Sequence, residues 1–415
     1  MSAARPTALL TLGRLPVALE LARSLRRLGW RTVVADPLRL HLARFSRAVD
    51  RTARPRAPAT DAEGYLDDLA ALCGREDVGL VVPVSEEAVH VARLRARPGF
   101  DVPVLCPGPD ATLALHDKWR FARTAAAAGL PVPATERCDA PAAAALAARV
   151  DHVVKPRLTA GGAGTAFGRA GDPLPTRAAT HLVQERLGAE PLCTCTLAAG
   201  GEPLATVAYR PRLVSGSVAV RLASVEVPEE ARETIAATAR AHRVDGAIAF
   251  DFHAGGDGRW RAIECNPRPT SGLHLMGEAV LDAALGRCIE ALGAGSPTGP
   301  VRSTRTDAPV EVPPGGERQE FWTSLTELQG RALRGRVSRA DWRALGTVRD
   351  VTWSRADPWP WLGMTLASAP LLWRAIRRRR PITEVTVEDV GWYVDTDARA
   401  GLADAGRVAA GGTDA

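Results

Sequence analysis

Short apolar runs alternate with helical patterns over the first hundred residues, and this order restricts the fold more than any other feature of the chain. Between the first two runs, apolar residues recur every three or four positions, and Gly29 stands where that helix would end. Parallel strands need a crossover connection, so the alternation predicts a parallel sheet with helices on its faces. The apolar runs occupy residues 7–12, 31–35, 78–84 and 102–105.

The first turn of this region argues against a dinucleotide-binding site. Residues 13–16 (GRLP) contain one glycine, whereas a pyrophosphate is approached through a G-x-G-x-x-G turn. Further on, Thr60 and Glu63 have the spacing of a capping box and predict a helix that continues through Leu72. We therefore expect a Rossmann-like scaffold that contributes one wall of a substrate cleft.

The composition fits a globular protein of two or three domains, because the 415 residues are 46% hydrophobic and 24% charged. The formal net charge of +6 suits small anions such as nucleotide phosphates. Only one basic run, Arg377 to Arg380, is present, so we expect no nucleic-acid partner. Seven scattered cysteines lack the paired spacing of a zinc site and predict reduced thiols. Residues 1–6 lack the apolar core of a signal peptide, which predicts a cytoplasmic location.

Two strand-like segments, 245–252 and 260–268, flank a glycine-rich turn and predict a β-hairpin. Because side chains alternate along a strand, Glu264 and Asn266 should point to one side, with Asp251 near them across the hairpin. Two carboxylates and an amide oxygen form the hard oxygen site that Mg²⁺ (or Mn²⁺) prefers. A sheet that exposes acids on its wet face is the alternative explanation. The opposite, buried face is expected to hold Phe250, Phe252, Ile263 and Cys265.

Three further segments carry polar residues at places where a nucleotide could bind. Lys155 ends a predicted strand before the glycine-rich loop 159–165, which could hold phosphate oxygens by charge and by backbone N–H groups. No Gly-Lys-Ser/Thr sequence opens a helix there, and taken alone a plain glycine turn explains the loop better. The predicted strand 182–187, with Glu190 beyond it, offers an edge for adenine and ribose. Residues 117–133 begin a helix with Asp-Lys and end in G-L-P-V-P.

The order of these four segments resembles the ATP-grasp superfamily. Its members have an Asp-Lys helix start followed by G-x-P-x-P, a Lys-Pro strand with a glycine loop, an acidic hinge and a closing hairpin with E-x-N-P-R. The resemblance covers roughly residues 1–295. It implies an α/β and α+β architecture with three parts: a pre-ATP-grasp, Rossmann-like parallel-sheet domain at 1–112, an ATP-grasp domain at 113–295 with its lid at about 150–190, and a linker and C-terminal region at 296–415.

The resemblance also implies a role for individual residues. Lys155 would contact ATP and act in catalysis, together with Arg268, which would stabilise the transferred phosphate. Many members have Glu or Gln slightly earlier on the first hairpin strand, near the position of Ala249. The further implied residues are Lys118 for ATP phosphates; Gly161, Gly162 and Gly164 for the mobile lid loop; Gln184, Glu185 and Leu187 for the adenine slot; Glu190 for ribose; and Asp251, Glu264 and Asn266 for Mg²⁺.

These parts imply a carboxylate-amine ligase that uses ATP to phosphorylate an acid or enol and then joins it to an amine in small-molecule or natural-product biosynthesis. A carboxylase, an enzyme like carbamoyl-phosphate synthase, and an ATP-binding module without turnover are the alternatives, and a homodimer fits the superfamily. Arg210, Arg212 and Arg221 flank a predicted strand pair and either bind a substrate carboxylate or lie in solvent. His274 either lies near the acceptor or packs structurally.

The C-terminal third contains a segment whose composition differs from the rest. Residues 358–376 are mostly apolar and tryptophan-rich, and arginines follow them. The stretch is short for a membrane span, so packing against the body or a partner is expected, with a weak membrane-surface contact through 359–380 as the alternative. The E-C-N-P-R-x-x-S-G sequence and the Asp357-Pro358 pair are similar to mycosporine-glycine-type ligases. The residues from Asp397 onward are expected to be disordered.

Overall fold

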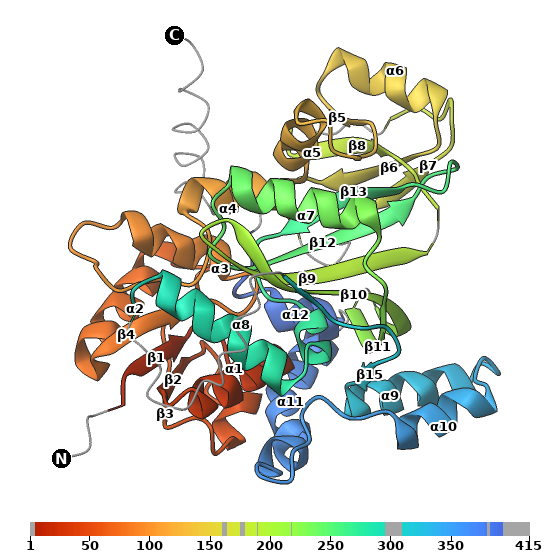
Figure 1. The fold of residues 1–415 in the computed structure, drawn as a ribbon. Helices are drawn as coiled ribbons and strands as arrows, with labels where there is room; N and C mark the ends of the chain where they lie inside the picture. Colours follow the sequence, from red (N-terminus) through yellow and green to blue (C-terminus); the bar gives the residue numbers. More distant parts are fainter. Residues whose placement is uncertain are drawn as a thin grey trace.

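The computed structural model describes residues 5–159, 164–174, 179–188, 190–216, 218–294, 309–379 and 382–392, and it contains three β-sheets with helices packed between and around them (Figure 1). One sheet is parallel and two are antiparallel in their main strands, which gives the mixed α/β and α+β architecture that the sequence predicts. Gly161, Gly162 and the predicted disordered tail lie outside the described residues.

The N-terminal sheet is parallel throughout, with the strand order β3-β2-β1-β4. Helix α1 (Pro16–Arg27) covers one face and helix α2 (Ala62–Glu76) the other, because their apolar sides belong to two different core clusters that take alternate residues of the strands. The strands are β1 (Thr7–Leu10), β2 (Arg31–Ala35), β3 (Arg51–Ala53) and β4 (Val78–Val82).

Two details of the predicted N-terminal region are wrong. The cap of α2 is Asp61, whose carboxylate accepts a hydrogen bond from the Gly64 N–H, and not Thr60, whose hydroxyl donates to the Ala57 carbonyl. The run 102–105 forms only a single bridge to β4. The connection from β4 to the next domain runs through α3 (Ala88–Val91), a 3₁₀ turn (Ala92–Ala96) and α4 (Pro109–His116).

A small antiparallel sheet forms the lobe at the top of Figure 1, with the order β5-β8-β6-β7. Helix α6 (Pro141–Arg149) packs Ala143 and Leu146 against Val154 and Val183 of its central strands. Helix α5 (Lys118–Ala127) connects the lobe to the body. The strands are β5 (Thr135–Arg137), β6 (His152–Pro156), β7 (Ala166–Gly168) and β8 (His181–Glu185).

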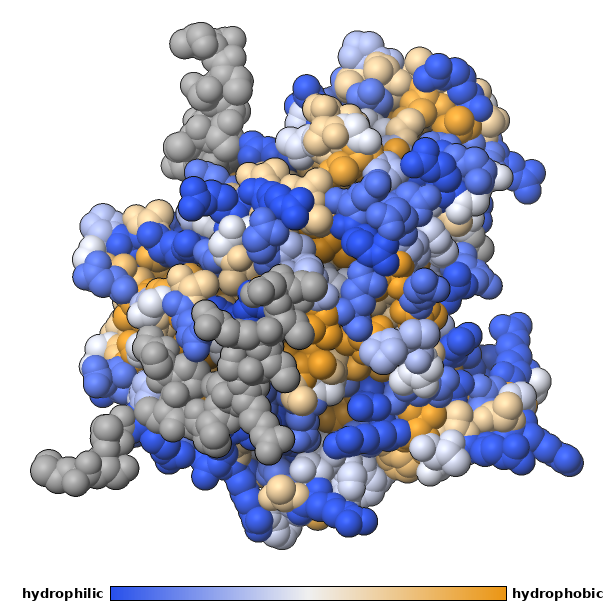
Figure 2. All heavy atoms as spheres, viewed as in Figure 1, coloured by the Kyte–Doolittle hydropathy of each residue, from blue (hydrophilic) through white to orange (hydrophobic). Residues whose placement is uncertain are grey.

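The large sheet forms the centre of the molecule, with the order β13-β12-β9-β10-β11-β15 and β14 beside β10. Helix α7 (Glu229–Ala241) covers one face, and helix α8 (Glu278–Ala291) lies between the other face and α1. On the face in Figure 2, hydrophilic side chains cover most of the outer surface. The strands are β9 (Pro191–Ala199), β10 (Glu202–Ser215), β11 (Val218–Val225), β12 (Gly246–Ala254), β13 (Trp260–Asn266), β14 (Val310–Glu311) and β15 (Glu317–Gln319).

The predicted hairpin exists as β12 and β13, but its register contains a bulge. Asp251 lies opposite Glu264, and the next pair is Phe252 with Ala262, so Ile263 has no partner across the strands. The bulge reverses the alternation beyond this point. Ala262 therefore takes the place in the core that the sequence assigns to Ile263, which is only half-buried.

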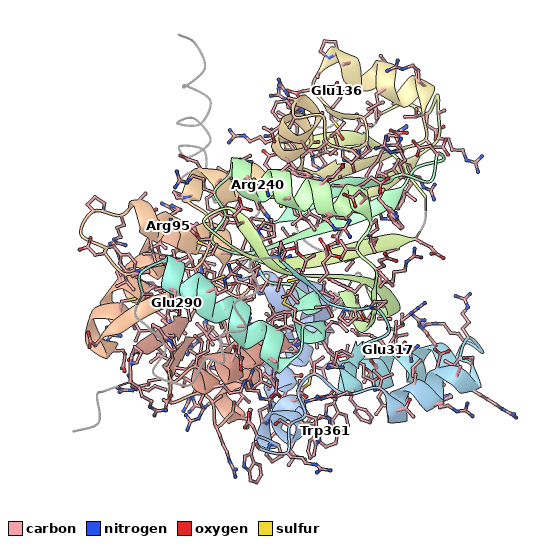
Figure 3. All side chains as sticks on the ribbon, in the orientation of Figure 1. Arg95, Glu136, Arg240, Glu290, Glu317 and Trp361 are labelled. Carbon is pink, nitrogen blue, oxygen red and sulfur yellow. The ribbon has the colours of Figure 1, made fainter. Side chains whose placement is uncertain are left out.

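The C-terminal region packs against the N-terminal domain and the large sheet. Asp357 accepts hydrogen bonds from the Ser46 hydroxyl and the Arg23 guanidinium, and Gly363 lets the following helix approach the Phe45 ring so closely that a Cβ would clash. In Figure 3, Trp361 projects from this helix, where its ring lies 5.2 Å from that of Trp322. The helices are α9 (Phe321–Ala332), α10 (Arg339–Thr347), α11 (Trp359–Arg378) and α12 (Ile382–Val387).

Helix α11 contains the predicted apolar segment and continues through Pro370 without interruption. Within the described ranges, no helix combines the length and apolar character needed to cross a membrane. Residues 309–318, which fall within the predicted linker, contribute β14 and part of β15 to the large sheet.

The residues after α12 lie against the carboxyl edge of the parallel sheet. Asp389 accepts from Arg14, in the loop after β1, and its carbonyl accepts from the Ala59 N–H, beyond β3. The Trp392 ring lies 4.8 Å from that of His90, beyond β4. Ligands of open α/β sheets bind outside the carboxyl ends of the strands, and here the C-terminal segment closes part of that edge.

Replacing Arg14 with Ala should destabilise the fold by about 3–5 kcal/mol, because the buried Asp36 carboxylate, 2.6 Å from the guanidinium, would lose its partner. The Arg14 guanidinium holds the pKa of Asp36 below its usual value despite burial, so this stabilisation is present above that ordinary pKa and is lost as the pH falls through the folded one. Urea unfolding measures the loss. Arg240→Ala, at an exposed ion pair with Glu202, is the control and should leave stability nearly unchanged; equal effects would contradict the assignment.

Candidate active site

Two acids and an amide lie on one side of the β12–β13 hairpin. Asp251 and Glu264 are opposite each other in the register, and their carboxyl groups are hydrogen-bonded. The Asn266 amide nitrogen lies 3.4 Å from a Glu264 oxygen, so these side chains share a face. The strand pair therefore brings together all three residues that the sequence proposes as metal ligands.

The two carboxyl groups differ in their affinity for a proton. Burial and the neighbouring Glu264 raise the pKa of Asp251 to about 7. Burial would raise the pKa of Glu264 as well, but the charges of Lys118 and Lys155 outweigh it and hold that pKa below its usual value. Asp251 therefore takes up a proton more readily than Glu264 does.

This pair fits a divalent cation. Two buried carboxylates repel each other unless a proton or a cation lies between them, and the Asn266 carbonyl oxygen offers a third hard ligand. Among the described residues, no group of three or more His, Cys, Asp or Glu side chains has the arrangement of a metal site. A bound ion would therefore complete its shell with water and phosphate oxygens, as Mg²⁺ commonly does.

Two lysines face the acids from the small-sheet lobe and the helix that leads to it. The Lys118 amine lies 3.4 Å from a Glu264 oxygen and also donates to the Thr159 carbonyl at the start of the glycine loop. The Lys155 amine lies 3.4 Å from the Ile263 carbonyl, in the bulge. Burial lowers the pKa of Lys155 to about 8. The negative charge of Glu264 opposes this shift, and the positive charge of Lys118 adds to it.

Asp117 fixes the position of Lys118. Its carboxylate caps α5 by accepting from the N–H groups of Trp119 and Arg120. The same carboxylate forms an ion pair with Arg157, just after β6. One side chain thus ties the helix that carries Lys118 to the strand that carries Lys155.

Arg268 connects the hairpin to the N-terminal domain. Its guanidinium donates to the side-chain oxygen Oδ1 of Asn266 at 3.3 Å and forms an ion pair with Glu86, in the loop after β4. His116 lies 3.9 Å from Glu86, and burial lowers its pKa to about 4, although Glu86 opposes this shift. Glu86 is absent from the sequence-based set, and its position just beyond the carboxyl end of a parallel strand is the signal that could have identified it.

The residues proposed for the nucleotide slot differ from one another in burial and in hydrogen-bond partners. Gln184 is buried and donates to the Thr135 hydroxyl at 2.9 Å, while Glu185 accepts from the Ala134 N–H at 3.3 Å. Leu187 is half-buried. Glu190 is exposed and forms an ion pair with Arg210.

Gly164, in the proposed lid, has φ +74°, and a Cβ there would press on the Pro156 ring. A glycine is therefore required at position 164, two residues before β7 begins.

The three arginines proposed for the substrate do not form one group. Arg210 stacks over the Trp260 ring at 5.4 Å, and Arg212 is exposed. Arg221 is buried and lies 2.9 Å from the Asp341 carboxylate of α10. His274 pairs with Glu20 of α1 at 3.2 Å. The contacts of Arg210, Arg221 and His274 join structural elements and do not mark a binding site for the acceptor.

Replacing Asp117 with Ala should destabilise the protein by more than the about 1–2 kcal/mol of a lost helix cap, because Arg157 also loses its partner, and should weaken binding of an ATP analogue because Lys118 loses its fixed position. Ser338→Ala is the matched control, since Ser338 caps α10 in the same way. In thermal unfolding the Ser338 variant should lose only the contribution of a cap, and only the Asp117 variant should bind the analogue more weakly. Equal affinities would contradict the positioning role.

Comparison with known proteins gives one family match and several solved structures with a similar fold. Residues 115–272 match a protein family described as "ATP-grasp domain". Comparison with curated protein sequences gave no match. Among solved structures, N5-carboxyaminoimidazole synthetase from Staphylococcus aureus matches with a TM-score of 0.54 at 13% identity, over 72% of this chain and 80% of that one.

Two more solved structures share the fold. The biotin carboxylase domain of 2-oxoglutarate carboxylase from Hydrogenobacter thermophilus, in complex with MgADP and bicarbonate, gives a TM-score of 0.57 at 15% identity, over 75% of this chain and 73% of that one. N5-carboxyaminoimidazole ribonucleotide synthetase from Thermus thermophilus gives 0.54 at 19%, over 75% and 81%. The family match thus identifies an ATP-grasp domain over residues 115–272, and the three solved structures share the fold of this chain.

Proposed function

We propose that this protein is an ATP- and Mg²⁺-dependent ligase that phosphorylates an acid or enol substrate and joins it to an amine, in small-molecule or natural-product biosynthesis. The observation that carries the proposal is the placement of Asp251, Glu264 and Asn266 opposite Lys118 and Lys155 in one buried site. Mg²⁺ held by the first three residues would neutralise charge on the nucleotide phosphates. In this proposal residues 1–112 contribute the substrate side and 113–295 the nucleotide side.

The charges of the protein's own residues suit phosphoryl transfer. An oxygen nucleophile that attacks the γ-phosphate brings two anions together, and catalysis must offset that repulsion. Lys118 and Lys155 lie where they would bind phosphate oxygens, and each now interacts with Glu264 or its neighbouring backbone. Binding of a nucleotide would let the lysines exchange these contacts for phosphate oxygens.

Arg268 is the residue best placed to stabilise the transferred phosphate. It is buried between the Asn266 amide and Glu86, so its position is set from both domains. A planar guanidinium can bind two oxygens of a phosphate or acyl-phosphate at once. The phosphorylated substrate would then lie between the hairpin and the carboxyl edge of the parallel sheet, where the amine must reach it before water does.

Release of ADP, measured with MgATP and pools of carboxylic acids and amines, tests the reaction class. The expected result is ADP formation that requires one acid and one amine together, with a new C–N bond in the product by mass spectrometry. Bicarbonate supplied in place of the acid pool separates the carboxylating alternative. ADP formation with bicarbonate alone would overturn the amine-ligase proposal while leaving the ATP site intact.

Replacing Glu264 with Gln should lower the ADP-forming rate by about 10²–10³-fold, because the charge that holds the cation would be lost while the shape is kept. Asp257→Asn is the matched control, since Asp257 is an exposed acid in the turn of the same hairpin and pairs with Arg261. The control should keep the wild-type rate. A wild-type rate in Glu264→Gln would exclude the proposed metal site.

The affinity for a non-hydrolysable ATP analogue should fall above pH 8, by up to about tenfold per pH unit. Burial lowers the pKa of Lys155 to about 8, so the free protein loses this charge as the pH rises, and binding of phosphate then requires proton uptake. Lys155→Arg keeps its charge and should flatten the profile. Calorimetric titrations at several pH values measure the effect, and parallel profiles for both proteins would contradict it.

A further inference from the structure

Helix α11 carries two opposite apolar faces, of which only one is covered. The covered face consists of small or apolar residues that recur at helical spacing and pack on the N-terminal domain and α12. Gly363 lies against the Phe45 ring, and Leu371 and Ala375 share a cluster with Leu38 and Val385. This face explains why the helix is part of the fold.

The opposite face points into solvent. Its residues lie three, seven, fourteen and seventeen positions along the helix from Trp359, which places them in one stripe along the helix. The exposed fractions of these residues range from 51% to 70%. Single exposed hydrophobic residues are common on protein surfaces, whereas a contiguous row of them marks an interaction surface. The stripe consists of Trp359, Leu362, Leu366, Trp373 and Ile376, with Leu372 exposed beside it.

The charges on helix α11 itself all have one sign. The sequence from Trp359 to Arg378 contains no Asp or Glu, and arginines gather at its C-terminal end. Arg374 and Arg378 pair with Asp389 and Glu388, which follow α12.

Arg377 and Arg379 are the remaining arginines at this end that the structure describes. Arg377 stacks on the Trp373 ring at 5.1 Å, and within the described residues neither Arg377 nor Arg379 has an acid within 4 Å. The exposed stripe is apolar, with tryptophans near both ends and arginines at one end. This pattern fits a surface with an apolar interior and an anionic outer layer.

We propose that the outer face of α11 binds an anionic membrane surface, with the helix lying in the plane of the interface. Trp359 and Trp373 would sit at the level of the head groups, where tryptophan is favoured. Arg377 and Arg379 would contact anionic lipid phosphates. A second copy of this chain fits this face less well. In a parallel pair of α11 helices the two basic ends would face each other, and in an antiparallel pair each would face the uncharged part of the stripe.

The full-length protein should co-sediment with vesicles of phosphatidylcholine and phosphatidylserine, and more weakly with vesicles of phosphatidylcholine alone. Binding should weaken as the salt concentration rises, because the arginine contacts are screened. The double variant Trp373→Ser, Ile376→Ser should bind at least about tenfold more weakly, since two apolar side chains no longer enter the interface. Arg377→Gln with Arg379→Gln should reduce only the phosphatidylserine-dependent part, by about tenfold or more.

Leu333→Ser is the matched control, because Leu333 is an exposed apolar residue just after α9, outside the stripe, and its loss should leave vesicle binding unchanged. Circular dichroism and thermal unfolding verify that each variant is folded. Absence of vesicle binding by the wild-type protein, or binding that the stripe variants do not weaken, would overturn the proposal. A dimer in solution that Ile376→Ser abolishes would also overturn it and would assign the face to a second copy. The vesicle assay needs no substrate, so its outcome is independent of the ligase reaction.

Discussion

The balance of charge around Glu264 is the interaction on which the site depends. A buried carboxylate next to a second acid would normally take up a proton, but Lys118 and Lys155 keep Glu264 ionised, so that Asp251 takes up a proton more readily. These groups come from three places in the sequence: the hairpin, the start of α5 and strand β6. The arrangement therefore exists only when the small-sheet lobe is positioned over the large sheet, which is what a binding site between two lobes requires.

Several buried charges join the parts of the protein to this centre. Arg268 pairs with Glu86 of the N-terminal domain, and Asp117 joins the helix and strand that carry the two lysines. Arg14 joins the parallel sheet to the C-terminal segment through Asp36 and Asp389. Breaking one partner of such a pair leaves an uncompensated buried charge, so these pairs favour one relative placement of the parts over others. A few guanidinium–carboxylate contacts thus hold the parts of the fold in one relative placement.

The places where sequence-based predictions are wrong share a cause. Strict alternation assigns Ile263 to the core, but the bulge after Asp251 shifts the register and puts Ala262 there. The Lys155 amine points at the carbonyl of that bulged residue, so the irregularity lies within the site. Thr60 has the spacing of a cap, yet Asp61 performs that role, because two neighbouring side chains can each reach the same helix end. In both cases a contact made in three dimensions decided between options that local spacing left nearly equal.

The sequence by itself determined the alternating parallel region and the acid hairpin with Glu264 and Asn266 on one side, because these follow from periodicities of two and about four residues. Only the tertiary structure decided that Glu86 meets Arg268, that Arg221 pairs with Asp341 of α10, and that the residues after α12 close part of the carboxyl edge of the first sheet. The physical reason is sequence distance: Glu86 and Arg268 are far apart along the chain, and no local pattern records which distant charges will share a buried space.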